Sequence, residues 1–173
     1  MKNNTLQTAT FGGGCFWCTE AIFASLIGVV RVEQGWFKIA DTTSDFSEAV
    51  RVTFDSDILS LTDLIAIHID THSATEVHSM RHKYRSAVYT YSEQQALQAH
   101  IAIHEKQNDY SKPLIVQVLA AGEFKHSPAK YQDYYYSNPH RPFCEMRINP
   151  KLSKLLAHYR DNVDRNKLSH LIL

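Results

Sequence analysis

Residues 9–26 read ATFGGGCFWCTEAIFASL, and this stretch predicts the start of the fold. Its apolar beginning is followed by three glycines, a cysteine at position 15, and apolar residues at helical spacing. Consecutive glycines allow a sharp turn, because a residue without Cβ adopts positive φ at little cost. We therefore expect a strand, a tight turn and a helix, with Cys15 at or just before the helix N-terminus.

Cys15 is the candidate nucleophile of this stretch. Unpaired N–H groups and the helix dipole favour negative charge at a helix N-terminus. Thiolates in such positions have lowered pKa values and raised reactivity. A cysteine packed beside a turn would be inert, but three glycines before Cys15 and two aromatic residues after it favour the reactive alternative.

Length and composition bound the class of protein. The 173 residues carry 18 Lys and Arg against 18 Asp and Glu, so their net charge of zero argues against binding to nucleic acid or a membrane surface. The N-terminus lacks the apolar core of a signal peptide, and no window is long enough to span a bilayer. We expect a cytoplasmic monomer. Three cysteines in that reducing setting indicate thiol chemistry rather than a disulfide framework.

The expected elements alternate between strand and helix along one catalytic domain, residues 1–160, followed by a loose tail at 161–173. Their order, β-α-β-β-α-β-α-β, predicts an α+β protein. We expect a ferredoxin-like two-layer sandwich with a mostly antiparallel sheet, helices packed on one face, and a C-terminal coil. Strands are expected at 8–11, 29–36, 48–54, 86–91 and 114–119, and helices at 15–26, 61–69, 92–107, 130–136 and 150–158.

Two further cysteines are candidates to form a disulfide with Cys15. Cys18 lies three residues on, on the same helix face, so a local disulfide is feasible. Cys144 lies in residues 139–151, PHRPFCEMRINPK, which we expect to form a flexible coil. We favour Cys144, because a coil can carry a thiol across the site whereas a cysteine on a helix must distort it.

Phe16 and Trp17 are candidates to bind an apolar group. Successive helical residues face about 100° apart, so two adjacent aromatic side chains at a helix start cannot both enter the core. At least one of them is expected to line an exposed pocket. An aromatic wall accepts a methyl group or a thioether well.

Residues 14–20, GCFWCTE, resemble the active-site motif of the peptide methionine sulfoxide reductase A family. FSEAV at 46–50 resembles the family's GH[AT]EAV segment, YRSA at 84–87 its QYRSA motif, and residues 139–151 its YCxxVIxPK segment. The resemblance covers roughly residues 5–155. It implies reduction of methionine S-sulfoxide in oxidised proteins or peptides, and possible action on the free amino acid, with thioredoxin as reductant and without cofactor or metal.

The resemblance also assigns roles to residues. It implies that Cys15 attacks the sulfoxide sulfur while Glu48 acts as general acid, because a carboxyl among aromatic residues has a raised pKa. Without the resemblance, a strand-end glutamate would be read as a solvated charge. The Tyr84 hydroxyl is implied to face the sulfoxide oxygen. Cys15 then becomes a sulfenic acid, which Cys144, or alternatively Cys18, converts to a disulfide.

Several positions depart from the family pattern. Its GND[VH]GTQYRS reads VHSMRHKYRS at 77–86, so the aspartate that places the substrate oxygen is Ser79 here. The NPTY segment before Glu48 and its tyrosine are missing, and Trp36 is the candidate to occupy part of that space. The histidine of YHQ[DK]Y is Tyr131. We therefore expect Phe16, Trp17, Trp36 and Ser79 to contact substrate in a divergent, slower enzyme.

Two other classes of protein fit parts of the sequence. Cys15-x-x-Cys18 at a helix start is also typical of a thiol–disulfide oxidoreductase of thioredoxin type. That class normally has small residues or proline between its cysteines. A zinc module is the second alternative, with Cys15, Cys18, His78 and His82 as ligands. The separation of the two pairs far exceeds a zinc-finger loop.

Overall fold

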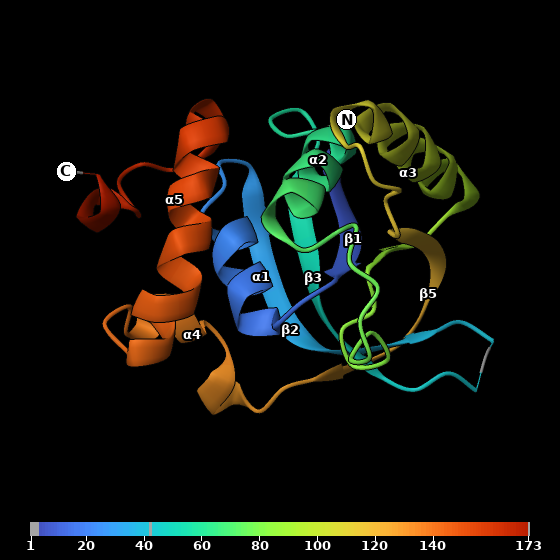
Figure 1. Ribbon diagram of the computed structural model, residues 1–173, viewed down its shortest axis with the longest axis horizontal. Coiled ribbons are helices and arrows are strands. Elements are labelled where there is room, and N and C mark those ends of the chain that lie inside the picture. Colours follow the sequence, from blue (N-terminus) through green and yellow to red (C-terminus); the bar gives the residue numbers. More distant parts are fainter. Residues whose placement is uncertain (1–3, 42, 173) are drawn as a thin grey trace.

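The computed structural model describes residues 4–41 and 43–172 (Figure 1). These residues form five strands and five α-helices in the order β1-α1-β2-β3-α2-β4-α3-β5-α4-α5. A π-helical turn at Cys144–Ile148 leads into the last helix. The strands are β1 (Leu6–Gly12), β2 (Val29–Ile39), β3 (Ser47–Asp55), β4 (Ala87–Thr90) and β5 (Gln117–His126). The helices are α1 (Phe16–Ala24), α2 (Leu61–Thr71), α3 (Glu93–Lys106), α4 (Tyr134–Ser137) and α5 (Asn149–His158).

The five strands form one closed sheet in the order β1-β3-β2-β5-β4. Neighbours are antiparallel except β4 and β5, which are parallel. The α+β class is confirmed, but the open two-layer sandwich is not. The physical reason is β5, which was expected at 114–119 and runs from Gln117 to His126. It pairs with β4 at one end and β2 at the other, so the sheet has no exposed edge to leave unpaired.

Alternation along β3 separates two apolar clusters. Val50, Val52 and Phe54 are fully buried against the helices that cover the outer side of the sheet. Ala49, just before Val50, turns to the inner side, where it forms a second buried cluster with Phe37 of β2 and with Ala87 and Tyr89 of β4. In Figure 1, α1, α2 and α5 lie side by side over the outer side. This arrangement places the N-terminus of α1 at the end of β1.

Capping side chains fix the N-terminal ends of α2 and α3. Ser60 and Asp63 form a complete capping box at α2. At α3, the Ser92 side chain accepts from the Gln95 N–H. The Gln95 side chain accepts from Tyr91 N–H, one residue earlier than a capping box would have it. The turn after α1 uses Gly28 at φ +94°, a conformation that favours glycine.

The C-terminal segment differs from the loose tail that we expect from its polar composition. Val163 and Leu168 are buried, and Val163 forms a β-bridge with Leu26. The Lys167 ammonium donates to the carbonyl of Ala24 at the end of α1. Two buried apolar side chains therefore dock residues 161–172 against α1, whereas residue 173 of the expected tail lies outside the described residues. None of the helices in the described ranges is long and apolar enough to cross a membrane.

Candidate active site

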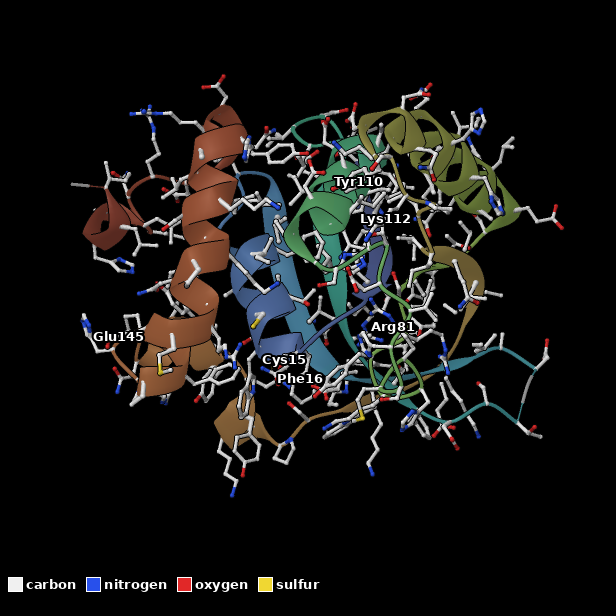
Figure 2. All side chains as sticks on the ribbon, in the orientation of Figure 1. Cys15, Phe16, Arg81, Tyr110, Lys112 and Glu145 are labelled. Carbon is white, nitrogen blue, oxygen red and sulfur yellow. The ribbon has the colours of Figure 1, made fainter. Side chains whose placement is uncertain are left out.

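Cys15 is the N-cap residue of α1, as the glycine turn predicts (Figure 2). Its carbonyl accepts from the N–H groups of Cys18 and Thr19 at 3.1 and 3.2 Å. The turn before it passes so close to α2 that a Cβ on Gly13 would lie 2.5 Å from the His72 ring. A side chain at Gly13 would displace either that ring or the thiol, so the glycine is required by this close approach.

The surroundings of Cys15 favour its thiolate. The Cys18 thiol as hydrogen-bond donor is the largest cause that lowers the pKa of Cys15, and the N–H groups of Trp17 and Cys18 add to it. Burial and the nearby Glu48 carboxylate oppose the shift without reversing it. The same contact and burial raise the pKa of Cys18. The pair therefore loses its first proton more readily at Cys15, while Cys18 retains its own.

Glu48 lies at the start of β3 beside this cysteine. Its Oε1 accepts from the Phe16 N–H at 3.3 Å, and the residue is 6% exposed. Burial raises the pKa of the Glu48 carboxyl, although the Phe16 N–H, Lys83 and the Tyr84 hydroxyl partly offset that effect. The structure thus brings Cys15, Glu48 and Tyr84 together, and it gives Glu48 a reason to keep its proton.

Aromatic side chains surround the start of α1. Phe16 is buried and meets the ring of Trp36 edge-on, with centroids 5.4 Å apart. Trp17 stacks on Tyr134 with centroids 3.9 Å apart and lies 6.1 Å from Tyr131. Phe16, Trp17 and Trp36 therefore form one cluster around Cys15. Trp17 and Trp36 are both half-buried, and the Trp17 indole N–H has no hydrogen-bond partner among the described residues.

The local structure and burial of Cys144 differ from what the sequence predicts. It lies in a π-helical turn rather than a flexible coil, and it is fully buried. The turn forms because Cys144 and Ile148 both pack into the core ahead of α5. Burial raises the pKa of the Cys144 thiol, and its charge contributes to the raised pKa of Cys18. All three cysteines are free thiols.

Ser79 is not brought to this group. Its side chain is exposed, and its carbonyl contacts the His82 ring nitrogen at 3.1 Å. Its segment is held instead by Arg81, whose guanidinium donates to the carbonyls of Gly13 at 2.9 Å and Tyr84 at 3.0 Å. Two further bonds reach the carbonyls of Ser73 and Glu76. Arg81 thereby joins the glycine turn to the backbone of Tyr84.

Sequence reasoning missed Arg81 and Lys83 as residues of the site. The Lys83 ammonium lies 3.7 Å from Glu48 Oε2 and 5.1 Å from the Tyr84 ring centroid. Both residues stand in the segment where the family pattern has glycine and glutamine, and that double change was the available signal. Lys151 was missed too. It is part of the PK pair after Cys144, and its buried ammonium lowers the pKa of Cys18.

Within the described ranges, no group of three or more His, Cys, Asp or Glu side chains is arranged to hold a metal ion. His78 and His82, the candidate zinc ligands, are exposed and contact backbone groups of their own loop.

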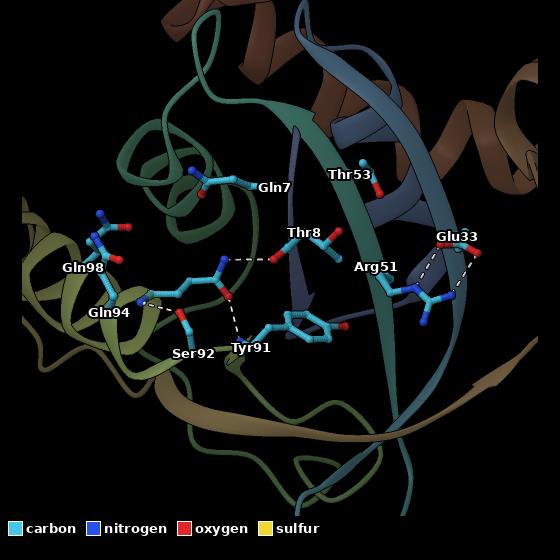
Figure 3. Close-up of a pocket in the computed structure, with 10 residues that line it drawn as sticks. Gln7, Thr8, Glu33, Arg51, Thr53, Tyr91, Ser92, Gln94 and Gln98 are labelled. Atoms are coloured by element: carbon cyan, nitrogen blue, oxygen red, sulfur yellow. Dashed lines mark hydrogen bonds and ion pairs between the residues drawn. The ribbon is translucent and has the colours of Figure 1, made fainter. Parts of the chain in front are cut away.

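A polar cavity of about 610 Å³ opens elsewhere on the sheet, where β1, β3 and α3 meet (Figure 3). Glu33 and Arg51 line it as a cross-strand pair, joined by two hydrogen bonds at 2.9 and 3.0 Å. The Arg51 guanidinium is the largest cause that lowers the pKa of Glu33 to about 2. Arg31 and His126 also contact the Glu33 carboxylate, and the thiols do not line this cavity.

Known proteins resemble the chain over most of its length. A sequence model of the family described as peptide methionine sulfoxide reductase matches residues 7–163. The protein named peptide methionine sulfoxide reductase MsrA from Deinococcus radiodurans is 32% identical, with 91% of this chain and 84% of the relative covered. The MsrA of Thermus thermophilus is 33% identical, with 86% and 92% covered.

Solved structures share the fold. Reduced Mxr1 from Saccharomyces cerevisiae aligns with a TM-score of 0.71 at 19% identity, covering 81% of this chain and 90% of Mxr1. The methionine sulfoxide reductase A of Corynebacterium diphtheriae aligns with a TM-score of 0.66 at 22% identity, covering 80% and 77%. A reactive thiol beside a buried carboxyl is the kind of site a thiol-dependent reductase needs. The chain belongs to the peptide methionine sulfoxide reductase family.

Proposed function

We propose that the protein reduces methionine S-sulfoxide in oxidised proteins and peptides to methionine. The observation that carries this proposal is the pairing of Cys15, whose pKa is lowered, with Glu48, whose pKa is raised, at one helix N-terminus. The first supplies a nucleophile for sulfur and the second a proton for oxygen. Membership of the family makes the sulfoxide the substrate on which these two groups act together.

The reaction divides into a reductive step and two thiol steps. The Cys15 thiolate attacks the sulfoxide sulfur, and the oxygen takes a proton from Glu48 while the Tyr84 hydroxyl donates a hydrogen bond to it. The protonated oxygen then transfers from the methionine sulfur to the Cys15 sulfur. Methionine leaves with its sulfur reduced by two electrons, and Cys15 is oxidised by the same two electrons to a sulfenic acid. A second thiol then displaces water from this sulfur and forms a disulfide. An external dithiol returns both cysteines to thiols by exchange.

Cys144 is the proposed resolving thiol, with Cys18 as the alternative. Cys18 already contacts Cys15 through a hydrogen bond, which favours it by proximity. Cys144 must leave its buried position, but it sits in a π-helical turn, which is wider and less stable than α-helix. Opening that turn would release the thiol while α5 stays docked.

We propose thioredoxin as the external reductant. A neighbour in structure is yeast Mxr1 in complex with Trx2, which aligns with a TM-score of 0.59 at 19% identity and covers 75% of this chain and 85% of Mxr1. We also propose that Phe16, Trp17 and Trp36 contact the methionine side chain, and that residues 1–160 form the catalytic domain of a monomer. Ser79, on the exposed loop, is proposed to contact the bound peptide outside this aromatic cluster. Within the closed sheet, β1 to β4 follow the connections of a ferredoxin-like unit, which β5 completes.

A single turnover tests the proposal. Reduced protein is mixed with excess S-sulfoxide peptide without external reductant, and methionine per protein is counted while disulfides are mapped by mass spectrometry. We expect about one equivalent and a disulfide from Cys15 to Cys144 or Cys18. Cys15→Ser should yield no methionine. Folded wild-type protein that forms no methionine would contradict the proposal.

One observation also favours the thiol–disulfide oxidoreductase. The contact between Cys15 and Cys18 is the one that such enzymes use. That function requires the protein with Cys144→Ser to reduce insulin disulfides through the remaining pair. We expect no such activity, because Phe16 and Trp17 between the two cysteines are packed against other aromatic rings and offer little surface for exchange.

A further inference from the structure

We propose that three lysines around the candidate active site select methionine sulfoxide in acidic peptide segments. The three, which we name the lysine rim, are Lys83, Lys125 and Lys130. This inference rests on the proposed reductase function and specifies its substrate class. It starts from the observation that each of the three ammonium groups lies over an aromatic ring of the site.

Lys83 is the innermost member. Its ammonium lies 5.1 Å from the Tyr84 ring centroid and 3.7 Å from Glu48 Oε2, with half of the side chain exposed. Hydrogen bonding with Tyr84 is the first cause that raises its pKa, and the neighbouring Glu48 and Cys15 add to that effect. The group therefore stays charged throughout the neutral range. It places a cation at the point where the sulfoxide oxygen must enter.

Lys125 and Lys130 extend the rim around the aromatic cluster. The Lys125 ammonium lies 5.9 Å from the Trp36 ring centroid, and that ring contacts Phe16. The Lys130 ammonium lies 4.9 Å from the Tyr131 ring centroid, and that ring lies beside Trp17. The side chains of both lysines are exposed. The three cations thus approach the cluster from β5, from the segment after it, and from the loop before β4.

Few carboxylates counter this charge. Within the described part of the chain, neither Lys125 nor Lys130 pairs with a carboxylate, and Lys83 pairs only with Glu48. Glu48 is held toward its neutral form by burial. Glu123, two residues before Lys125 on β5, is the nearest exposed acid along that strand. The face around Cys15 therefore carries excess positive charge, although the whole chain is neutral.

Such a face recognises negative charge on either side of the oxidised methionine. Exposed ammonium groups attract anionic partners over about one Debye length, which is about 10 Å at 0.1 M salt. That distance spans the residues next to methionine in an extended peptide. Glutamate and aspartate neighbours would be drawn to the rim, and lysine or arginine neighbours would be repelled. The aromatic cluster binds the methionine side chain in both cases.

The test compares three blocked tripeptides that carry the S-sulfoxide between two glutamates, two glutamines or two lysines. We expect kcat/KM for the glutamate peptide to exceed that for the lysine peptide by roughly tenfold or more at low salt. The ratio should fall toward one at about 1 M salt, where the Debye length is about 3 Å. The glutamine peptide gives the reference rate. If even that peptide is not reduced, the proposed function has failed; if it is reduced and the glutamate and lysine peptides react equally, only the lysine rim is overturned.

Variants locate the selectivity. The triple change Lys83→Gln, Lys125→Gln and Lys130→Gln should bring the ratio close to one, whatever its effect on the glutamine peptide, because Lys83 also contacts the general acid Glu48. The double change Lys125→Gln and Lys130→Gln leaves that contact intact, so it should lower the ratio while the glutamine peptide keeps its wild-type rate. Lys112→Gln is the matched control, because Lys112 is an exposed lysine far from Cys15 in Figure 2 and should keep the full ratio. A triple variant with an unchanged ratio would contradict the assignment. Should the triple variant fold poorly, Lys125→Gln with Lys130→Gln must still lower the ratio.

Discussion

Glu33 and Glu48 lie on neighbouring strands and are almost equally buried, at 9% and 6% exposure, yet the pKa values of their carboxyl groups are shifted in opposite directions. Glu33 faces Arg51 across the strand pair, and this guanidinium lowers its pKa to about 2. Glu48 lies on the other side of the sheet, where burial raises its pKa, and among the described residues the cation that pairs with it, Lys83, is 3.7 Å away. Burial alone therefore does not decide the charge of a carboxyl; its nearest donor does.

The Glu33 carboxylate stabilises the fold, whereas the Glu48 carboxyl is placed to take part in the reaction. Glu33 gains a charge-assisted fork of hydrogen bonds that stabilises the fold and leaves no proton to give. Glu48 accepts one long bond from a backbone N–H, and its further contacts with Lys83 and Tyr84 leave its pKa raised. The Cys15 thiol beside it has a lowered pKa. Only the second arrangement can deliver a proton to a substrate held at Cys15.

The largest effect is expected from Glu48→Gln. The amide keeps the shape and the contact with Phe16 but has no acidic proton, so kcat/KM should fall by about 10²–10⁴-fold, the usual contribution of a general acid. Thermal unfolding should change little. Glu33→Gln is the matched control, and it should keep the activity while the melting temperature falls. Equal losses of activity in both variants would remove the distinction between the two carboxyls.

A second expected loss distinguishes two arginines. Arg81→Ala leaves the carbonyls of Gly13 and Tyr84 without their donor, and the displaced turn should lower kcat/KM by roughly tenfold to a hundredfold. Arg81→Lys should recover part of that rate, since an ammonium still donates to one or two carbonyls. Arg51→Ala should lower the unfolding free energy without this kinetic loss. If Arg81→Ala and Arg51→Ala lose kcat/KM in the same proportion to their loss of unfolding free energy, Arg81 has only a structural role.

A third prediction concerns the stability that Glu33 contributes. Its folded pKa lies below the ordinary 4.5, so the contribution is present above pH 4.5 and is lost as the pH falls toward about 2. Because the pair borders a water-accessible cavity, we expect only about 1–2 kcal/mol between wild type and Glu33→Gln at neutral pH. Urea unfolding at several pH values measures it. A difference that persists unchanged at pH 2 would contradict the role of Arg51.

The smallest expected effect is a shift in the pKa of the Cys15 thiol. It is measured by the pH dependence of alkylation with iodoacetamide. The midpoint should lie below 9.0 in the wild type. Cys18→Ala removes the main hydrogen-bond donor and should raise the midpoint, whereas Glu48→Gln removes a nearby negative charge and should lower it. Glu33→Gln should leave it unchanged. Shifts of the opposite sign would overturn the electrostatic account of the thiol.

Local signals in the sequence predicted much of this arrangement. Three glycines before Cys15 were enough to place the thiol at a helix N-terminus, and the expected helices at 61–69 and 92–107 are α2 and α3. Glu48 and Tyr84 were found only through the family resemblance, since a glutamate at a strand start has no local mark of burial. The structure places Glu48 beside Cys15 and Tyr84 beside Glu48.

Features that depend on distant contacts could not be predicted in this way. Closure of the sheet requires β5 to extend to His126 and pair with β2, and this exposed, weakly alternating segment gave no such signal. Cys144 lies between prolines, which favours coil locally, but burial of Cys144 and Ile148 against the core imposes a helical turn. Three bonds of Arg81 stay within its own segment, but the fourth reaches the Gly13 carbonyl, 68 residues away, which only the fold brings near.

The most direct test of the account is the titration of the Glu48 carboxyl by NMR, with the side-chain carbons of glutamate labelled and Glu48→Gln used for assignment. The account predicts a midpoint above 4.5 for Glu48, and one near 2 for Glu33 in the same spectra. A Glu48 midpoint at or below 4.5 would mean that its proton is absent near neutral pH and would contradict its role as the general acid.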